Sequence, residues 1–226
     1  MKPTLHPKVK ICCISSIAEA KLAIENGADA IGLVGEMPSG PGIISDELIK
    51  KIASIIPPSI SSFLLTSETT TTKIIEHHKK VNTNTIQIVD KLTKGNYQDL
   101  RIKLPEIDIV QVIHVIGEES ITEALNIAPF VDYLLLDSGN PNLKIKTLGG
   151  TGKVHNWEIS KRIRESVKIP VFLAGGLNSQ NIKAAINKVQ PFGVDLCSGV
   201  RTNGKLDERK LKSYFDTVKN YQTRIE

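Results

Sequence analysis

The chain has 226 residues, of which 40% are hydrophobic, and this length and composition suit one α/β domain with a single core. Lys and Arg exceed Asp and Glu to give a net charge of +5, yet only 4% of the residues are aromatic, which disfavours base stacking and hence nucleic-acid binding. No apolar run of about 18 residues occurs, and residues 1–10 contain no apolar signal region, so we expect a cytoplasmic protein that does not bind membranes.

Short apolar runs rich in Val and Ile alternate with segments of helical period along the chain, which predicts a parallel β-sheet covered by helices. The expected strands are 9–15, 30–35, 60–65, 85–89, 109–115, 131–137, 170–174 and 193–197. Eight strand and helix units in this length favour a (β/α)8 TIM barrel over an open doubly wound sheet, and no glycine-rich dinucleotide loop follows the first strand. We predict a single TIM-barrel domain of the α/β class over residues 1–226.

Polar residues that can cap free N–H groups mark the starts of several expected helices. Four of these helices are preceded by Ser16, Ser45, Asn178 and Asp207. His77 and His78 lie in a helical stretch beside charged residues, so we expect both on the solvated surface. No spacing of His, Cys, Asp and Glu resembles a zinc site.

The end of the first strand carries candidate chemistry, because barrel enzymes place catalytic groups at the carboxyl ends of their strands. Alternation along Lys10-Ile11-Cys12-Cys13 puts Lys10 and Cys12 on one face and Cys13 on the other. We therefore expect one thiol in the barrel interior and the other against the helices. Together with Cys197 the cysteines are odd in number and include an adjacent pair, which favours free thiols. By residue type alone, Cys12 is either reactive or a small buried core residue.

The sixth expected strand ends in a carboxylate, Asp137, directly after an apolar run. A buried carboxylate is costly without a partner or a role, so Asp137 is a catalytic candidate, or else a residue that caps the turn at Ser138. The glycine-rich connection 138–156 follows a strand end, and we expect it to be an active-site loop.

Glycine-containing turns follow the seventh and eighth expected strands. The turns are Ala174-Gly175-Gly176-Leu177-Asn178 and Cys197-Ser198-Gly199-Val200-Arg201. TIM barrels often bind a phosphate between the loops after these two strands, where backbone N–H groups point at the anion. A second interpretation is that the glycines only permit left-handed turns. The first interpretation predicts a phosphorylated small-molecule substrate, which a mildly positive protein attracts.

Together these motifs make the chain resemble the phosphoribosylanthranilate isomerase family. The segments that carry the resemblance are 10–15, 26–32, 149–157, 174–178 and 191–200. The resemblance covers nearly the whole chain. It implies isomerisation of N-(5-phosphoribosyl)anthranilate to 1-(2-carboxyphenylamino)-1-deoxyribulose 5-phosphate, an Amadori rearrangement of tryptophan biosynthesis.

By the same resemblance, Asp137 is the general acid that opens the furanose ring and Cys12 is the general base that removes the C2 proton. The residues expected to bind the substrate and its phosphate are Lys10, Gly175, Gly176, Ser198, Gly199 and Arg201. The resemblance implies no cofactor and no metal, and a phosphorylated sugar derivative as the partner. The exposed helix faces of a barrel permit either a monomer or a homodimer.

The chain departs from the family pattern at three places. Cys13 replaces the glycine that usually follows the catalytic cysteine, and the segment 37–45 lacks the arginine taken to bind the anthranilate carboxylate. The segment 87–90 reads Gln-Ile-Val-Asp, where the family usually has Gln-Leu-His-Gly. Because an unpaired carboxylate in a pocket is costly, alternative functions are a paralogous phosphosugar isomerase or lyase, or a non-catalytic barrel that binds a phosphorylated metabolite.

Overall fold

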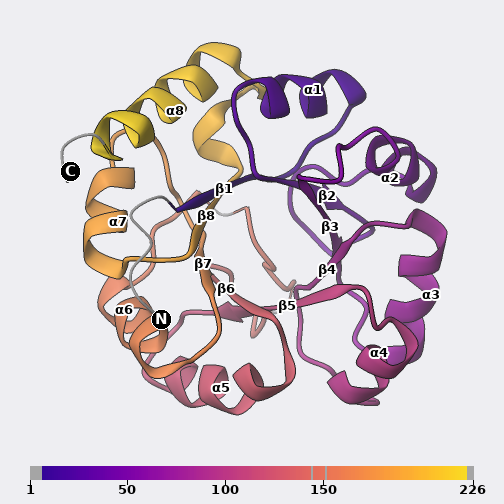
Figure 1. Cartoon of the computed structure of the whole chain (residues 1–226). Coiled ribbons are helices and arrows are strands. Elements are labelled where there is room, and N and C mark those ends of the chain that lie inside the picture. Colours follow the sequence, from indigo (N-terminus) through magenta and orange to yellow (C-terminus); the bar gives the residue numbers. More distant parts are fainter. Residues whose placement is uncertain (1–6, 144, 151, 223–226) are drawn as a thin grey trace.

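Eight parallel strands close into a barrel, with each strand beside its neighbours in the chain and β1 beside β8 (Figure 1). The strands are β1 (Lys8–Ile11), β2 (Ala30–Val34), β3 (Ser61–Thr66), β4 (Thr85–Ile88), β5 (Asp108–His114), β6 (Tyr133–Asp137), β7 (Val171–Leu173) and β8 (Gly193–Leu196). This computed structural model describes residues 7–143, 145–150 and 152–222. The predicted TIM barrel is confirmed, and each predicted apolar run overlaps one of these strands, with β1, β3 and β5 extending one residue beyond the predicted range.

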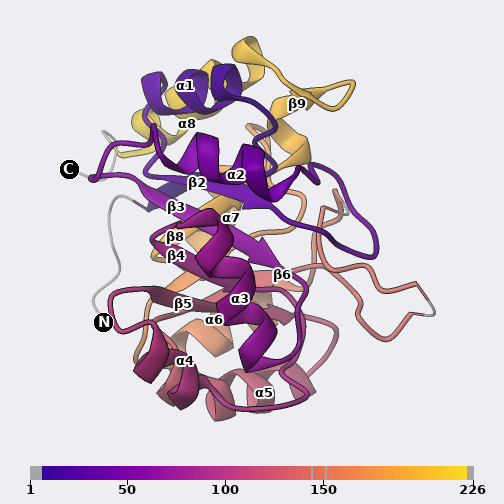
Figure 2. The same cartoon turned by 90° about the vertical axis from the view of Figure 1, so that its right-hand side faces the viewer.

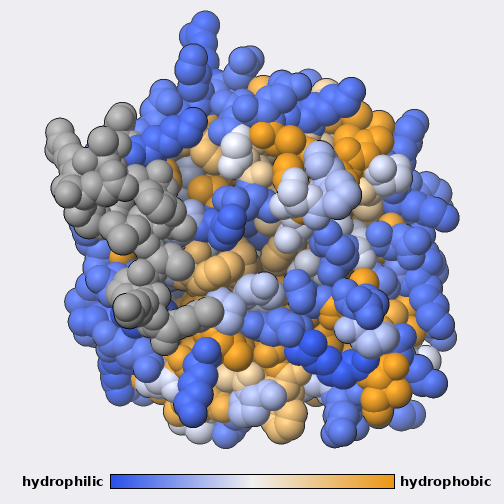
Figure 3. Space-filling view, in the orientation of Figure 1, coloured by the Kyte–Doolittle hydropathy of each residue, from blue (hydrophilic) through white to orange (hydrophobic). Residues whose placement is uncertain are grey.

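Helices surround the barrel (Figure 1). They are α1 (Ile17–Glu25), α2 (Asp46–Ala53), α3 (Thr71–Val81), α4 (Tyr97–Lys103), α5 (Glu119–Ile127), α6 (Trp157–Ser166), α7 (Ile182–Val189) and α8 (Glu208–Gln222). Shorter elements are the 3-10 turns η1 (Ala128–Phe130) and η2 (Ser198–Val200) and the antiparallel strands β9 (Arg201–Thr202) and β10 (Lys205–Leu206). Figure 3 shows hydrophilic residues over much of the outer rim, as expected where each helix packs its apolar face inward.

Polar caps start several of these helices, as the sequence predicts. Ser16 and Ser45 accept main-chain N–H bonds at the starts of α1 and α2, and Asp207 does so at the start of α8. Asn178 has a different place. Its carboxamide oxygen accepts the N–H of Asn181 at 3.2 Å and closes a turn, and α7 starts only after Asn181.

The core has one layer inside the barrel and another between the strands and the helices, because side chains alternate along each buried strand. The inner layer contains Phe63 and Phe172, whose ring centroids lie 6.0 Å apart. It also encloses an ion pair in which Lys10 Nζ lies 3.0 Å from Asp195 Oδ1. This pair joins β1 to β8, the two strands that close the barrel.

The expectation that His77 and His78 lie on the surface is wrong. Both side chains are buried. The ring nitrogens of His77 lie 2.9 Å from Thr66 Oγ1 and 3.0 Å from Asp46 Oδ1, and His78 Nε2 lies 2.7 Å from Thr83 O. Hydrogen-bond partners on neighbouring elements therefore allow both imidazoles to be buried, although the residues beside them in the sequence are charged.

The connections after β2 and β6 extend on the same side of the barrel, at the carboxyl ends of the strands (Figure 2). The Ser39 hydroxyl donates to Lys146 O at 2.6 Å and joins the two connections. Thr151, in the predicted motif of the second connection, lies outside the described residues. No described helix is long and apolar enough to cross a membrane.

Candidate active site

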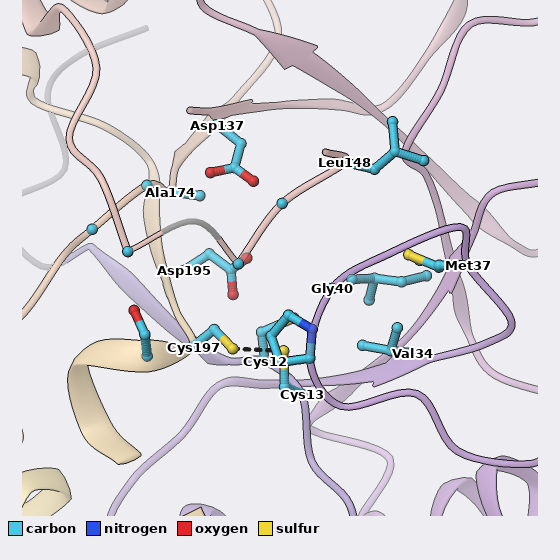
Figure 4. A pocket seen from close by; sticks show the side chains of 18 of the residues that line it. Cys12, Cys13, Val34, Met37, Gly40, Asp137, Leu148, Ala174, Asp195 and Cys197 are labelled. Atoms are coloured by element: carbon cyan, nitrogen blue, oxygen red, sulfur yellow. Dashed lines mark hydrogen bonds between the residues drawn. The ribbon is translucent and has the colours of Figure 1, made fainter. Parts of the chain in front are cut away.

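A pocket lies between these two connections, and both of them contribute to its lining. The predicted site residues that line it are Cys12, Asp137, Gly175, Gly176 and Ser198. Figure 4 shows Asp137 and the cysteines around this cavity, with Asp195 between them. The fold thus brings together side chains from four widely separated parts of the sequence.

The two adjacent cysteines both line the pocket. β1 ends at Ile11, so Cys12 and Cys13 follow the strand. The φ angle of Cys13 is 61°, in the left-handed region, which turns its side chain toward the pocket. The prediction that the two thiols face opposite layers is therefore wrong, because strand alternation stops at Ile11. Cys12 is anchored by its N–H, which donates to Leu196 O at 2.7 Å.

Asp137 ends β6 with a buried carboxyl group in the pocket wall. The N–H of Ser138 donates to Asp137 Oδ1 at 2.7 Å, and a Cβ at Gly149 would lie 2.9 Å from Asp137 Oδ2. Burial raises the pKa of Asp137 above the usual carboxyl value, although the Ser138 hydrogen bond opposes the shift. A carboxyl group with a raised pKa in a pocket is suited to proton donation.

The glycine turn after β7 forms another wall of the pocket. Gly175 and Gly176 have φ angles of 82° and 61°, so both adopt the left-handed backbone that glycine favours. A Cβ at Gly176 would lie 2.7 Å from the main-chain carbon of Lys153. The phosphate-site interpretation and the left-handed-turn interpretation are compatible, because the left-handed turn places the main chain of Gly175 and Gly176 at the pocket. Ser198, at the start of η2, lines the pocket beside them.

Two of the predicted site residues, Gly199 and Lys10, are not part of the described lining of the pocket. A Cβ at Gly199 would collide with the carbonyl oxygen of Leu177, so this glycine permits close packing of the two turns. Lys10 is fully buried beside Asp195. Burial lowers the pKa of Lys10, but the neighbouring carboxylate outweighs burial and raises it, so the ammonium group stays charged.

Arg201 also lies outside the pocket lining, and the expectation that it binds substrate needs correction. Its Nη1 donates to Glu19 Oε1 at 3.0 Å, and its Nη2 donates to the carbonyl oxygens of Cys12 and Cys13 at 3.2 and 2.5 Å. The guanidinium group is buried and engaged by protein acceptors. Arg201 therefore holds the main chain at the end of β1, next to the pocket.

Four polar residues of the pocket were missed as candidates: Ser39, Gln87, Asp195 and Cys197. Asp195 interrupts the apolar strand β8, and this is the same signal that identified Asp137. Gln87 is buried on β4, and its Oε1 has no hydrogen-bond partner among the described residues. A polar side chain within an apolar strand would have indicated both residues.

Two departures from the family pattern lie in contact. Gly42 belongs to the segment 37–45, which lacks the arginine, and its φ angle is 80°. A Cβ at Gly42 would lie 2.5 Å from the Cβ of Cys13. The side chain of Cys13 thus occupies the space beside Gly42. None of the described residues that line the pocket is Lys or Arg.

Comparisons with known proteins point to one family over nearly the whole chain. Residues 9–217 match the family model for N-(5'phosphoribosyl)anthranilate (PRA) isomerase. An N-(5'-phosphoribosyl)anthranilate isomerase of Methanosarcina acetivorans is 34% identical over 96% of this chain and 95% of its own. The crystal structure of phosphoribosyl anthranilate isomerase from Thermotoga maritima is 30% identical, covers 95% of this chain and 99% of its own, and superposes with a TM-score of 0.78. A crystal structure of phosphoribosyl anthranilate isomerase in complex with reduced 1-(o-carboxyphenylamino)-1-deoxyribulose 5-phosphate is 27% identical with the same coverage and a TM-score of 0.74.

Proposed function

The chain belongs to the N-(5'-phosphoribosyl)anthranilate isomerase family, and from this premise we propose that Cys12 and Asp137 are the acid/base pair of its reaction. The protein is an aldose–ketose isomerase of tryptophan biosynthesis, which converts N-(5'-phosphoribosyl)anthranilate to 1-(2-carboxyphenylamino)-1-deoxyribulose 5-phosphate. One observation carries the proposed pair: both side chains line a single pocket at the carboxyl ends of the barrel strands.

The first step opens the furanose ring, and it requires a proton on the ring oxygen. Asp137 donates this proton as the bond between C1 and the ring oxygen breaks, and the nitrogen lone pair forms an iminium at C1. Burial of the carboxyl group supports this role, because the raised pKa of Asp137 keeps it protonated to a higher pH than an ordinary aspartate.

The second step removes the proton from C2 of the iminium. The Cys12 thiolate accepts this proton, the C–H electrons form a double bond between C1 and C2, and the nitrogen becomes neutral. Tautomerisation of the resulting enol to the C2 ketone places a proton on C1 and completes the rearrangement. Main-chain hydrogen bonds to Leu196 O and from Arg201 support this role, since they fix the backbone that carries the Cys12 sulfur.

We propose that the substrate phosphate binds at Gly175, Gly176 and Ser198, with the main chain of Gly199 behind them. These turns follow β7 and β8, the usual phosphate position in TIM barrels. The aromatic ring is then placed on the apolar side of the pocket, which includes Val34, Met37 and Leu148 (Figure 4).

The test of the acid/base pair is turnover of freshly generated phosphoribosylanthranilate, followed by the loss of anthranilate fluorescence. We expect Cys12→Ala and Asp137→Asn to lower kcat by about 10²- to 10⁴-fold. Cys13→Gly is the matched control, because glycine tolerates the left-handed backbone at this position and the neighbouring thiol has no part in the proposed steps. Loss of turnover in Cys13→Gly with retention in Cys12→Ala would exchange the roles of the two thiols. An inactive wild-type protein that still binds phosphate esters would place the specificity change in the segment 37–45.

We also propose that the enzyme acts in the cytoplasm as a monomer or a homodimer and does not bind nucleic acid. The net charge of +5 and the small aromatic content support the last point.

A further inference from the structure

Two thiols at the pocket have no role in the isomerisation. Cys13 follows β1 and Cys197 follows β8, and their sulfur atoms lie 2.6 Å apart (Figure 4). A disulfide bond is about 2.05 Å long, so the two sulfurs would need to approach by only about 0.5 Å to form one. Both residues line the pocket that contains Cys12.

The backbone holds these sulfurs in place. Cys13 adopts a left-handed conformation that non-glycine residues rarely take, and this conformation directs its side chain toward the end of β8. The missing side chain of Gly42 leaves the space that Cys13 fills, since a Cβ there would lie 2.5 Å from the Cβ of Cys13. The N–H of Cys12 donates to Leu196 O at 2.7 Å and ties the two chain segments together next to the thiols.

The surroundings give the two thiols different reactivity. The hydrogen bond between Cys197 and Cys13 and the positive charge of Arg201 lower the pKa of Cys197, although burial opposes this. Hydrogen bonds with Cys12 and Cys197, together with burial, raise the pKa of Cys13. Cys197 is also partly exposed, whereas Cys13 is buried. Cys197 is therefore the thiol that ionises first and that a small oxidant reaches.

We propose that Cys13 and Cys197 form an oxidant-sensitive dithiol site, at which a low-molecular-weight disulfide links them into an intramolecular disulfide that slows the isomerase. The Cys197 thiolate attacks one sulfur of the oxidant, forms a mixed disulfide and releases one small thiolate. The Cys13 sulfur then loses its proton and attacks the Cys197 sulfur, which releases the second small thiolate. The two cysteines lose two electrons and two protons, and the small disulfide becomes two thiols.

The bond acts on catalysis through its neighbours. It pulls the chain beside Cys12 toward the chain beside Ser198, and catalytic groups must be held within about 0.5 Å of their productive geometry. We expect turnover to fall about tenfold, less than the 10²-fold cost of a displacement of about 1 Å. This effect rests on the proposed roles of Cys12 and Ser198, whereas formation of the bond does not. Reversible disulfides of this kind are typical of redox-sensitive cytosolic proteins.

The test uses the full-length protein and oxidised glutathione. After incubation we expect titration of the denatured protein to find one free thiol of three, and peptide mass mapping to identify a Cys13–Cys197 cross-link. Turnover should fall about tenfold and return after dithiothreitol is added. Cys13→Gly lacks the resolving thiol and cannot form the cross-link. After a mild reductant has cleaved any glutathione adduct on the protein, the turnover of the oxidised variant should equal that of the reduced variant.

Several outcomes would overturn the proposal. A stable glutathione adduct without the cross-link would show that the pair does not close. Equal inhibition of Cys13→Gly would attribute the effect to a glutathione adduct on Cys12 or Cys197 and not to the cross-link. A complete cross-link with unchanged turnover would reject the regulatory effect. If the reduced wild-type protein had no isomerase activity, the proposed function would fail, and the thiol titration and mass mapping would still decide whether the bond forms.

Discussion

At the scale of single residues, the environment of Asp137 makes a prediction about pH. Its general-acid role needs the protonated form, and burial raises its pKa, so kcat/KM should hold to a higher pH than an ordinary aspartate allows and then fall as the pH rises through the raised pKa. A profile of kcat/KM against pH in the wild-type protein measures this falling limb. The residual activity of Asp137→Asn should lack it. A falling limb that is identical in both proteins would assign the acid to another group.

Arg201 makes a second prediction at this scale, because one buried guanidinium serves two purposes. It pairs with Glu19, and it donates to the carbonyl oxygens of Cys12 and Cys13. Arg201→Leu should lower the free energy of unfolding by about 1–3 kcal/mol, since it removes the charged partner of the half-buried Glu19 carboxylate and the donor to two carbonyl oxygens. It should also lower kcat with little change in KM. The measurements are urea unfolding and steady-state kinetics.

The matched variant for this prediction is Glu19→Gln. It removes the ion pair but keeps the donors of Arg201 on the carbonyl oxygens beside the proposed base. We expect it to lose stability and to retain kcat. Equal losses of kcat in Arg201→Leu and Glu19→Gln would show that Arg201 contributes to stability and does not position the proposed base.

At the scale of elements, the connection after β2 and the end of β1 are packed as one unit. A Cβ at Gly42 would lie 2.5 Å from the Cβ of Cys13, whereas nothing lies nearer than 4.0 Å to a Cβ at Gly40, and both glycines have positive φ. Gly42→Ala should therefore destabilise the protein by about 1–3 kcal/mol more than Gly40→Ala, because only Gly42→Ala adds overpacking to backbone strain. Urea unfolding of both variants measures the difference.

The same unit predicts a specific rescue. Cys13→Gly should remove part of the excess cost of Gly42→Ala, because the Cα of residue 13 still lies 2.8 Å from the added Cβ. It should leave the cost of Gly40→Ala unchanged, since residues in contact couple by about 0.5–3 kcal/mol and separated ones do not. Strict additivity of Gly42→Ala and Cys13→Gly would contradict the contact.

At the scale of the whole molecule, barrel closure brings the ends of the chain together at the site. β1 pairs with β8, and the pocket receives side chains from segments as far apart as Cys12 and Ser198. Because the proposed acid, the proposed base and the proposed phosphate turns all belong to one barrel, specific activity should not change when the enzyme is diluted from micromolar to nanomolar concentration. A loss of activity on dilution, matched by dissociation in light scattering, would show that a homodimer is the active form.

The sequence by itself determined the fold class, because apolar runs of Val and Ile separated by segments of helical period indicate a parallel sheet covered by helices, and eight such units in this length favour a closed barrel over an open sheet. It also indicated Cys12, Asp137 and the glycine turns, since polar and glycine residues after apolar strands are visible locally. That residues 1–226 form a single domain stays a prediction.

Only the tertiary structure decided the orientation of the side chains, because orientation depends on contacts between distant segments. The left-handed backbone of Cys13 brought both thiols to one pocket, which strand alternation did not predict. Arg201 was assigned to Glu19 rather than to substrate because α1 and β9 meet only in the folded barrel. The short distance between Cys13 and Cys197, 184 positions apart in the chain, likewise exists only after β1 and β8 have paired.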